Sequence, residues 1–413
     1  MSSLLHDAGI IIRESIQAVL PDEAVRKALH GLDLPQRITL VAIGKAAWRM
    51  AHTACVQLPG RIAQGVVITK YGHSEGALPG LEIIEAGHPV PDENSIRGAQ
   101  RALELVTPLT QNDAVLFLVS GGGSALFEKP LPGASLADIA GITGQLLACG
   151  ADITEINAVR KHLSAVTGGR FAEACAPARV FCVMLSDVLG NAPDVIASGP
   201  AAPDSSGCST VQAVISKYAL DVPAHLKPLL ALETPKQLSG VTTLVTGSVE
   251  ALCQAAARSA GRLGYTPRIL TSSLCCEARE AGAMLAAAAQ EIRSGPPSPP
   301  CALIAGGETV VHLRGKGKGG RNQEIALAAA EKLDGLRDVC LFSLGSDGTD
   351  GPTDAAGGIV TGETAALCRA RGLSIGNALR NNDAYPLLQA LDALIMTGPT
   401  GTNVNDVTVL LCR

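Results

Sequence analysis

The chain has 413 residues, and a typical domain length of about 150 residues predicts two or three domains. The formal net charge is −5 and only 2% of the residues are aromatic. The chain therefore lacks both the positive charge that attracts nucleic-acid phosphates and the aromatic side chains on which bases stack, which argues against a nucleic-acid partner. The apolar fraction of 47% supports a large core, but apolar runs such as Ala114 to Val119 are far shorter than the roughly 18 residues of a membrane span.

The N-terminus and the cysteines indicate the expected compartment. The first 16 residues lack a basic start followed by an uninterrupted apolar stretch, so we expect no signal peptide and a cytoplasmic protein. Twelve cysteines are scattered through apolar segments without a CxxC pair, which favours reduced, mostly buried thiols over zinc sites or disulfide bonds.

Short apolar runs alternate with longer helical patterns, which is typical of an α/β protein with mostly parallel sheets. Strands are predicted over residues 38–43, 66–69, 114–119, 180–185, 242–245, 302–305 and 339–344, and helices over 94–106 and 277–293. A proline-containing polar break over 232–240 places the domain boundary, giving domains 1–236 and 237–413. A second break, over 294–300, is interpreted as a loop inside the C-terminal domain.

Glycine-rich or polar residues follow several of the predicted strands. GKAAW follows Ile43, SGGGSALF follows Val119, SDVLGN follows Leu185 and GSDGTDGPTD follows Leu344. In open α/β sheets, ligands bind beyond the carboxyl ends of the strands. We therefore locate the functional edge of the protein at these strand ends.

The SGGGS stretch, Ser120 to Ser124, is a candidate phosphate-binding loop because its glycines let backbone N–H groups approach an anion. A tight turn between a strand and a helix explains the same pattern equally well. No Walker A pattern occurs anywhere in the chain. Lys45, at another strand end, could reach a terminal phosphate, although a solvated lysine is the simpler interpretation of that residue alone.

Four aspartates follow predicted strands: Asp187, Asp347, Asp350 and Asp354. Oxygen ligands clustered on loops suit Mg²⁺ bound together with phosphates, which needs only one or two carboxylates. Aspartate and glycine also form ordinary Asx turns. We expect two of the four carboxylates to contact a metal.

Two further segments carry candidate substrate contacts. GHPVPDENS is interpreted first as a rigid loop with a helix cap at Asp92 or Asn94, and the alternative is a substrate contact by His88. In NAVRKHLS, Arg160 or Lys161 could hold a carboxylate, and a solvated helical face explains these cations nearly as well.

GKGKGGRNQE, Gly315 to Glu324, places Lys316, Lys318 and Arg321 in a glycine-rich turn between a strand predicted over 309–313 and a helix predicted over 325–333. A helix start attracts phosphate through its unpaired N–H groups and partial positive charge. A cation beside that end is unfavourable unless an anion lies between them, so we infer a phosphate there.

The same turn formally matches GxGxxG, so an NAD(P)-dependent reductase is a competing hypothesis. Hydride transfer leaves the SGGGS loop, Lys45 and the aspartates unexplained. Phosphoryl transfer explains all three, because cations and Mg²⁺ neutralise charge on the moving phosphoryl group.

Taken as a set, these motifs resemble the type II glycerate kinases, the glycerate 2-kinase family with a C-terminal MOFRL domain, whose members have often been labelled hydroxypyruvate reductase. The matching stretches run nearly end to end and are AIGKAAWRMA, GHPVPDENS, SGGGSALF, NAVRKHLS, LSDVLGNAPDVIASGP, GGRNQE and GSDGTDGPTDAAGG. The resemblance implies a Rossmann-like N-terminal domain with a mostly parallel sheet and flanking helices, and a smaller C-terminal α/β domain.

The resemblance also implies ATP-dependent phosphorylation of D-glycerate to 2-phosphoglycerate, with Mg²⁺, in a cleft between the two domains. NAD(P)H-dependent hydroxypyruvate reduction remains the alternative. The expected partners are ATP and D-glycerate, with no nucleic acid and no membrane, and a homodimer is left open.

Carried over residue by residue, Lys45 and Arg321 match the lysine and arginine expected to act on the transferring phosphate. The residues predicted to bind the nucleotide are Ser120, Gly121, Gly122, Gly123, Ser124, Lys316, Lys318, Gly319, Gly320, Asn322 and Glu324. Those predicted to bind substrate are His88, Arg160 and Asn191, and those predicted to bind metal are Asp187, Asp347 and Asp350. Asn191 stands where the family often has an aspartate, so metal binding is assigned to Asp187 instead.

Overall fold

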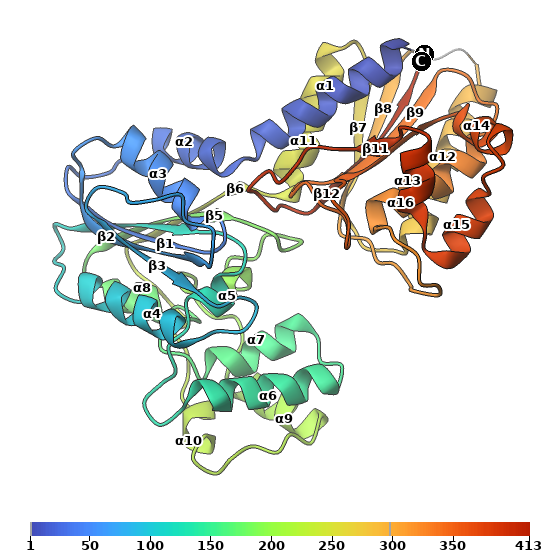
Figure 1. The fold of residues 1–413 in the computed structure, drawn as a ribbon. Helices are drawn as coiled ribbons and strands as arrows, with labels where there is room; N and C mark the ends of the chain where they lie inside the picture. Colours follow the sequence, from blue (N-terminus) through green and yellow to red (C-terminus); the bar gives the residue numbers. More distant parts are fainter. Residues whose placement is uncertain (1, 297–298) are drawn as a thin grey trace. The chain divides into compact units, whose positions relative to one another are not determined.

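The structure, a computed structural model, describes residues 2–296 and 299–413. Its contacts divide the chain into two compact units, which we call the N-terminal unit (Ala24–Thr246) and the C-terminal unit (Met1–Glu23 with Gly247–Arg413) (Figure 1). This division differs from the boundary expected after residue 236, because it falls ten residues later and assigns the first helix to the C-terminal unit. The proline-rich break predicted over 294–300 includes residues 297 and 298, which lie outside the described residues.

The N-terminal unit is built on a six-stranded sheet with the order β3-β2-β1-β4-β5-β6. Its strands are β1 (Ile38–Ile43), β2 (Ile62–Lys70), β3 (Leu81–Ala86), β4 (Ala114–Val119), β5 (Arg179–Leu185) and β6 (Val241–Gly247). The pairs from β3 to β5 are parallel, which confirms the expected Rossmann-like sheet. Every residue of β1 and β4 is buried, as in a parallel sheet covered on both faces.

Helices cover both faces of this sheet. The helices α2 (Pro21–His30) and α3 (Ala47–Gln57) pack on the face that contains Leu40 and Ala42. The helices α4 (Glu93–Val106), α5 (Gly123–Leu126) and α8 (Arg170–Cys175) lie on the opposite face, which contains Val41 and Ile43. Consecutive strand residues point to opposite faces, so each face has its own core.

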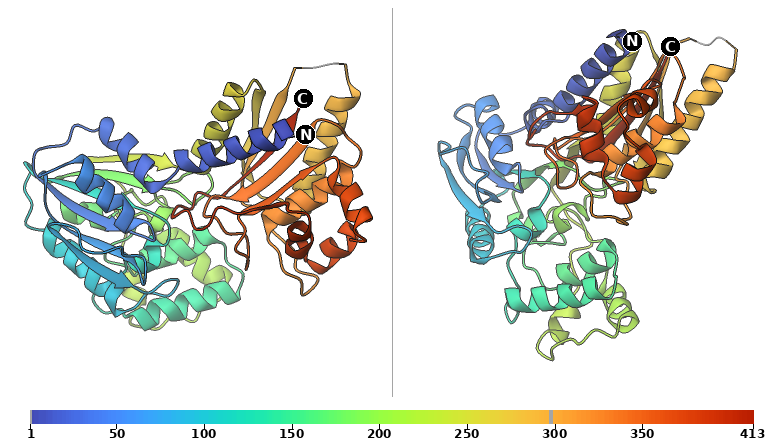
Figure 2. Two further views of the ribbon diagram at one scale, coloured as in Figure 1. Left: turned by 45° about the horizontal axis from the view of Figure 1, so that its top comes forward. Right: turned by 45° about the vertical axis from the view of Figure 1, so that its right-hand side comes forward.

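A small group of helices extends from the sheet of the N-terminal unit and has a separate core. It contains α6 (Leu136–Ala148), α7 (Ile153–Lys161), α9 (Cys208–Lys217) and α10 (Lys227–Leu230), and the short 3₁₀ helix η1 (Ile196–Ser198) lies between α7 and α9 in the chain. The green and yellow-green helices of this group stay together in both views of Figure 2. We call it the helical subdomain.

The C-terminal unit contains a second six-stranded sheet with the order β11-β10-β9-β12-β8-β7. Its strands are β7 (Thr266–Leu274), β8 (Cys301–Gly307), β9 (Val339–Gly345), β10 (Gly357–Thr361), β11 (Leu394–Ile395) and β12 (Asp406–Cys412). Only the β7–β8 pair is parallel, and the other described pairs are antiparallel. The expectation of mostly parallel sheets is therefore wrong for this unit, because apolar periodicity predicts a strand but not its direction.

Helices also cover both faces of the second sheet. On one side α1 (Ser2–Ala18) packs beside α11 (Val249–Arg262), as Figure 1 shows. The remaining helices are α12 (Ala278–Ser294), α13 (Arg321–Lys332), α14 (Thr364–Ala370), α15 (Ile375–Asn381) and α16 (Ala384–Ala390). They share one hydrophobic core with Leu341 of β9 and Leu410 of β12.

Several predicted elements were found and one was not. The strands predicted over 38–43 and 114–119 agree with β1 and β4 at both ends. The strand predicted over 309–313 is absent apart from a single bridge between Val310 and Glu277. Its residue Leu313 is 81% exposed, so the apolar pattern there does not correspond to burial.

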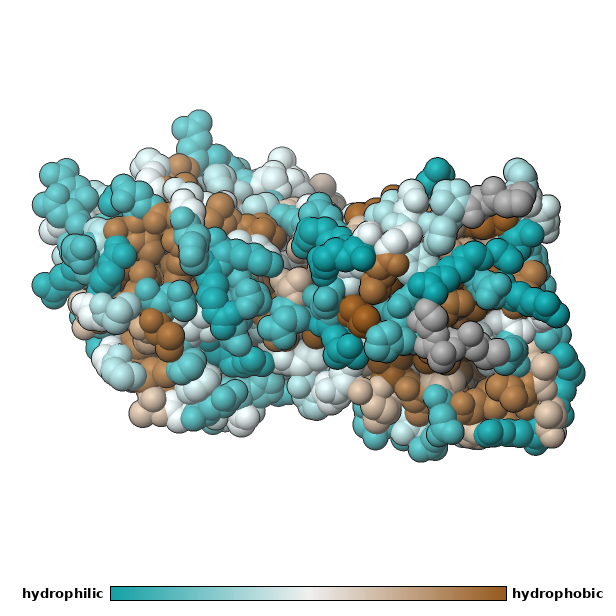
Figure 3. All heavy atoms as spheres, turned by 90° about the horizontal axis from the view of Figure 1, so that it is seen from above, coloured by the Kyte–Doolittle hydropathy of each residue, from teal (hydrophilic) through white to brown (hydrophobic). Residues whose placement is uncertain are grey.

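The surface drawn in Figure 3 has mixed polarity, since hydrophobic residues form separate patches among hydrophilic ones in each unit. Among the described residues, we find no helix with the length and apolar character needed to cross a membrane.

Candidate active site

The predicted site residues fall into two groups, one in each compact unit. The N-terminal group lies beyond the ends of β1, β3, β4 and β5, with Arg160 on α7, and the C-terminal group lies around the start of α13. We describe each group by itself.

Ser120 holds together the two loops that follow β1 and β4. Its hydroxyl oxygen accepts the N–H of Ala46 at 3.0 Å, and its O–H donates to the carbonyl of Ile43 at 3.2 Å. The N–H of Lys45 donates to the carbonyl of Gly121 at 2.9 Å. The structure thus brings the predicted lysine and the predicted glycine loop together, as the adjacency of strand ends implied.

Lys45 and His88 meet at Gly122. This glycine has φ 85°, and a Cβ added to it would lie 2.9 Å from the His88 ring and 3.3 Å from Cγ of Lys45, so only glycine fits. Burial lowers the pKa of His88, and the positive charges of Lys45, Lys70 and His73 lower it further. We call these four side chains the cation cluster. It favours an anionic ligand such as a carboxylate or a phosphate.

Asp187 follows β5 and packs against the glycine loop. A Cβ added at Gly121 would lie 2.5 Å from Oδ2 of Asp187, so the missing side chain makes room for this carboxylate. Asn191 lies in the following turn with φ 52°, and its N–H donates to the carbonyl of Val188 at 3.2 Å. Asp187 thus lies against the glycine loop.

The predicted substrate residue Arg160 has protein partners. Its Nη2 donates to the carbonyl of Ser124 at 2.9 Å and lies 3.7 Å from the carboxylate of Glu128. Glu128 is fully buried; burial raises its pKa, and the charge of Arg160 opposes that rise. Arg160 is thus hydrogen-bonded to the glycine loop. A contact between Arg160 and substrate stays a prediction.

Lys161 does not lie on a solvated helical face, so that interpretation is wrong for this residue. It is 3% exposed, and its Nζ lies 3.0 Å from Oδ1 of Asp204. Lys161 therefore binds a carboxylate of the protein itself, and the binding of a substrate carboxylate by Arg160 or Lys161 stays a prediction.

In the C-terminal unit, the glycine-rich turn packs against the segment between α15 and α16. The N–H of Lys316 donates to Oδ1 of Asn381 at 3.3 Å, and the N–H of Lys318 donates to Oδ1 of Asp383 at 2.8 Å. A Cβ added at Gly317 would lie 2.4 Å from Cβ of Asp383. The glycines therefore allow close packing of the chain on itself, and these two N–H groups bind protein oxygens.

The side chains of Lys316 and Lys318 are exposed. The Lys318 ammonium lies 4.0 Å from the centre of the Tyr385 ring, and the Tyr385 hydroxyl donates to Oδ1 of Asp354 at 2.7 Å. Asp354 thus has a structural partner, while both lysines present their charge to solvent.

The start of α13 is capped by Asp350, which lies about 30 residues further along the chain. Its carboxylate accepts the N–H of Asn322 at 3.2 Å and the N–H of Gln323 at 2.9 Å. A Cβ at Gly320 would lie 2.2 Å from the Asp350 carboxyl carbon. Burial raises the pKa of Asp350 to about 7, and the two N–H bonds oppose this rise. The anion inferred at this helix start is therefore a side chain of the protein in this structure.

Arg321, the first residue of α13, binds two carboxylates. Its Nε and Nη2 contact Asp406 at 2.5 and 3.0 Å, and its Nη1 contacts Glu308 at 3.0 Å. Burial alone would lower the pKa of Arg321, but the hydrogen bonds and charge of Asp406 and the charge of Glu308 raise it above the usual arginine value. About a third of the side chain, 33%, remains exposed and can face a ligand.

Asp347 lies close to this arrangement. A Cβ at Gly345 would lie 3.3 Å from Oδ1 of Asp347 and 3.4 Å from Oδ1 of Asp406, so the two carboxylates flank that glycine. Oδ1 of Asp347 also accepts the N–H of Thr349 at 2.9 Å, which forms an Asx turn.

Two predicted nucleotide contacts lie in the interior instead. Glu324 is 1% exposed and accepts hydrogen bonds from Arg279 at 2.7 Å and Asn382 at 2.7 Å. Asn322 is fully buried, and its Oδ1 accepts the hydroxyl of Ser343 at 2.6 Å. The structure gives both residues partners within the protein.

Sequence reasoning missed Asp406 and Glu308 as partners of Arg321. Glu308 follows closely after the strand predicted over 302–305, so its position signalled a possible site. Asp406 begins β12, a strand that was not predicted, and it lies 85 residues from Arg321 in the chain.

Two family models match the chain. The model described as "Domain of unknown function (DUF4147)" matches residues 7–231, and the model described as "MOFRL family" matches residues 301–406.

Two similar sequences and one solved structure span nearly the whole chain. A D-glycerate 2-kinase of Thermotoga maritima is 54% identical over 401 residues, which cover 97% of this chain and 96% of that protein. A putative hydroxypyruvate reductase of Agrobacterium vitis is 39% identical and covers 91% of this chain and 87% of its own. The crystal structure of a glycerate kinase from Thermotoga maritima superposes with a TM-score of 0.97 at 53% identity and covers 100% of both chains.

Proposed function

Because the chain belongs to the type II glycerate kinase family, we propose that it transfers the γ-phosphoryl group of ATP to the 2-hydroxyl group of D-glycerate. The observation that carries the proposal is the 54% identity to a D-glycerate 2-kinase over 97% of this chain. The cation cluster supports the same chemistry, because both D-glycerate and the transferring phosphoryl group are anionic.

The cation cluster is suited to holding an anion beside the glycine loop of the N-terminal unit. Lys45 neutralises charge that develops on the phosphoryl oxygens, and a positioned donor of this kind contributes most in the transition state. His88, whose pKa is lowered, offers a neutral N–H to the substrate. Asp187, packed on Gly121, can orient the attacking hydroxyl group or hold a cation.

In the C-terminal unit, Arg321, Lys316 and Lys318 offer positive charge to the ATP phosphates. Arg321 keeps a third of its side chain exposed while Asp406 and Glu308 fix its orientation. A planar guanidinium fixed in this way suits a phosphate, since it can donate two parallel hydrogen bonds.

The aspartates fit Mg²⁺ to different degrees. Asp187 and Asp347 place hard oxygen ligands at strand ends, as an Mg²⁺ site shared with phosphates requires. Asp350 accepts two backbone N–H bonds at the start of α13, so we assign it to capping and leave Mg²⁺ to Asp187 and Asp347. When bound, Mg²⁺ supplies charge neutralisation at the phosphate oxygens.

The relative named as a putative hydroxypyruvate reductase favours a second candidate function, NAD(P)H-dependent reduction. A dinucleotide site places pyrophosphate at the start of the helix that follows the glycines. Here the N–H groups at the start of α13 already donate to Asp350, whereas the phosphate contacts proposed for ATP come from the side chains of Lys316, Lys318 and Arg321. The geometry of this turn therefore supports the kinase over the reductase.

The two functions are separated by two assays with the same preparation. The chain with D-glycerate, ATP and Mg²⁺ should release ADP, and phosphorus NMR should show the phosphate on the 2-hydroxyl. Removal of Mg²⁺ with a chelator should stop turnover, and added Mg²⁺ should restore it. Oxidation of NADH with hydroxypyruvate, without ADP formation in the first assay, would overturn the proposal.

A further inference from the structure

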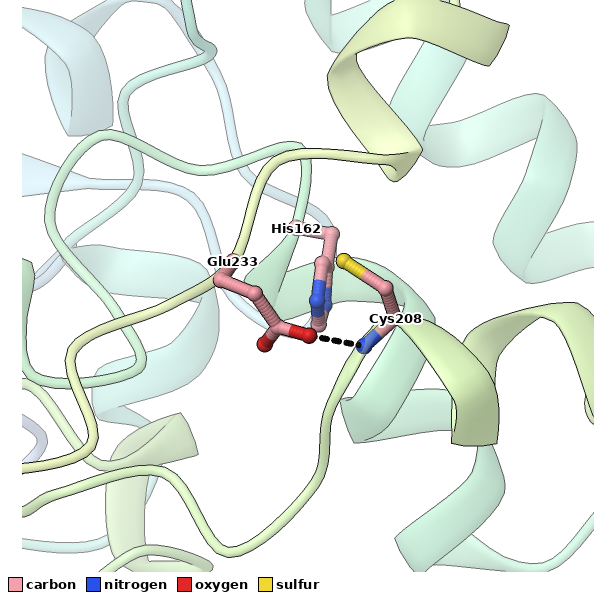
Figure 4. A group of neighbouring side chains, drawn as sticks. All are labelled: His162, Cys208 and Glu233. Carbon is pink, nitrogen blue, oxygen red and sulfur yellow. Dashed lines mark hydrogen bonds between the residues drawn. The ribbon is translucent and has the colours of Figure 1, made fainter.

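Three side chains with metal-binding atoms meet in the N-terminal unit. His162 follows α7, Cys208 begins α9, and Glu233 lies between α10 and β6. One ligand atom from each lies within 4.8 Å of the other two. Figure 4 shows the His162 ring between Cys208 and Glu233. None of the three residues is needed for the proposed kinase reaction.

His162 has the arrangement of a metal ligand. Its side chain is fully buried, and Nδ1 lies 2.8 Å from the carbonyl of Ala158, so Nδ1–H donates there and Nε2 keeps a free lone pair. Among the described residues, Nε2 has no hydrogen-bond partner. A metal-binding histidine usually donates its other ring N–H to a carbonyl or a carboxylate in this way.

Cys208 and Glu233 complete a mixed set of ligands. The N–H of Cys208 donates to Oε1 of Glu233 at 3.0 Å, which holds the carboxylate beside the thiol. Lys236 lies 3.1 Å from the other carboxylate oxygen, but a carboxylate has about four acceptor positions, so one remains for a cation. Nitrogen, sulfur and oxygen ligands together suit Zn²⁺, whereas Mg²⁺ prefers oxygen ligands alone.

Asp204 holds the three ligand-bearing segments in place. It is 3% exposed and accepts hydrogen bonds from Lys161 at 3.0 Å, from Thr234 at 2.8 Å and from the N–H of Ser206 at 3.0 Å. Lys161 and Thr234 are direct neighbours of His162 and Glu233, and Ser206 lies two positions before Cys208. A buried network thus supports the three segments, while the ligands themselves range from buried His162 through partly buried Cys208 to exposed Glu233.

We propose that His162, Cys208 and Glu233 form a three-ligand site for Zn²⁺, with water in the fourth position. Metal–ligand bonds of about 2.0–2.3 Å in tetrahedral geometry separate the ligand atoms by about 3.3–3.8 Å, so the side chains must close by about 1 Å. Binding releases the thiol proton of Cys208 to solvent, because the thiolate is the ligand. The bound ion would join α7, α9 and the segment before β6.

The test uses the full chain, reduced and freed of metal by a chelator. Co²⁺ serves as the spectroscopic probe for a zinc site, because a bound thiolate gives a charge-transfer absorption. We expect this absorption at one equivalent of Co²⁺, its loss when Zn²⁺ displaces Co²⁺, and a higher melting temperature with Zn²⁺.

Two variants and two controls make the result specific. Cys208→Ser should lose the thiolate absorption, and Glu233→Gln should keep it but bind Zn²⁺ about tenfold or more weakly. Cys149→Ser and Cys275→Ser, which change exposed cysteines outside the cluster, should bind like the unmodified chain. The proposal is overturned if the unmodified chain gives no thiolate absorption, or if Cys208→Ser binds Co²⁺ with the same spectrum and affinity.

Discussion

Lys45 and Arg321 differ in what surrounds their charges. Lys45 lies with Lys70, His73 and His88, and the charges of the first three lower the pKa of His88. Arg321 binds the carboxylates of Asp406 and Glu308, so its charge is already compensated. A ligand anion therefore gains more at Lys45, and substitutions at the two residues should have different consequences.

Replacing Lys45 should affect catalysis with little effect on stability. The residue is half-buried among like charges, so Lys45→Ala removes repulsion as well as a phosphate contact. We expect kcat/KM for D-glycerate to fall by about a hundredfold or more, with an unchanged melting temperature. The control is Lys227→Ala, an exposed lysine of α10. If kcat/KM of Lys45→Ala equals that of the control, Lys45 does not take part in the reaction.

Replacing Arg321 should affect both stability and activity. Arg321→Ala leaves Asp406 buried without its ion-pair partner, which should cost about 3 kcal/mol in the free energy of unfolding of the C-terminal unit. Arg321→Lys keeps the charge but not the planar pair of donors, so it should keep most of the stability and lose about tenfold or more in kcat/KM.

Urea unfolding and steady-state kinetics of both Arg321 variants separate the two effects. Arg369→Ala is the stability control, because it breaks an exposed ion pair with Asp334 and should cost under about 1 kcal/mol. If Arg321→Lys is as active as the unmodified enzyme, Arg321 has a structural role alone.

The pKa of His88 should report the occupancy of the cation cluster. Burial and the charges of Lys45, Lys70 and His73 lower this pKa, so the imidazole is neutral at pH 7 and takes up a proton only at lower pH. A bound carboxylate or phosphate favours the charged imidazole, so D-glycerate should raise the pKa, as should Lys45→Met in the free enzyme. NMR titration, with His88→Gln to assign the signal among the eight histidines, measures both shifts. A pKa of His88 above about 6.5 in the free enzyme would contradict the lowering.

The glycine-rich turn shows which parts of a site can be predicted from local sequence. Its glycines and cations are visible in the chain, and they led to the prediction of a phosphate at the helix start. In the structure the group at the helix start is the carboxylate of Asp350, about 30 residues away. The partial positive charge of a helix start stabilises a carboxylate as well as a phosphate, so the local sequence does not distinguish the two. The ligands of the proposed zinc site are also far apart in the chain, and no local spacing connects them.

At the scale of elements, the tight turn after β4 depends on Gly122. Alanine there would have both an unfavourable φ of 85° and a Cβ 2.9 Å from His88. Gly150 has a similar φ of 73° but nothing within 4 Å of the added Cβ, so Gly150→Ala isolates the backbone effect. We expect both variants to lose about 1 kcal/mol of stability and only Gly122→Ala to lose most of its activity. Equal activities in the two variants would show that contact with His88 does not matter.

The strand predictions that are correct at both ends are for strands with both faces buried. β1 and β4 are continuous apolar runs in the middle of a parallel sheet, and their predicted ends are correct. β3 and β7 were missed because neither has a continuous apolar run, and most of β7 is exposed. β12 is fully buried, but its antiparallel position between β8 and β9 depends on tertiary pairing.

At the scale of the whole molecule, the first helix belongs to the C-terminal unit. Asp7 of α1 accepts hydrogen bonds from Tyr265 at 2.8 Å and from Arg413 at 2.6 Å. The hydroxyl of Thr402 donates to the carbonyl of Val19 at 3.0 Å. A boundary drawn once along the chain cannot describe this arrangement, because the C-terminal unit is made from both ends of the sequence.

This arrangement predicts that a core substitution in α1 weakens the opposite end of the chain. Ile11 is fully buried, so Ile11→Ala should lower the stability of the C-terminal unit by about 2–5 kcal/mol. Leu5→Ala on the same helix is the control, because Leu5 is 42% exposed and its truncation should change stability by under about 1 kcal/mol.

Hydrogen exchange measured by mass spectrometry locates the effect. Ile11→Ala should speed amide exchange in α11 and β9, which α1 contacts, and leave β1 and β4 protected as before. Faster exchange in β1 and β4 to the same extent would mean that the units unfold together and that α1 does not act through the C-terminal unit alone. Unchanged exchange in α11 would instead show that α1 does not stabilise the core of that unit. A cavity left by Ile11→Ala should first weaken the packing of α11, the helix that lies beside α1.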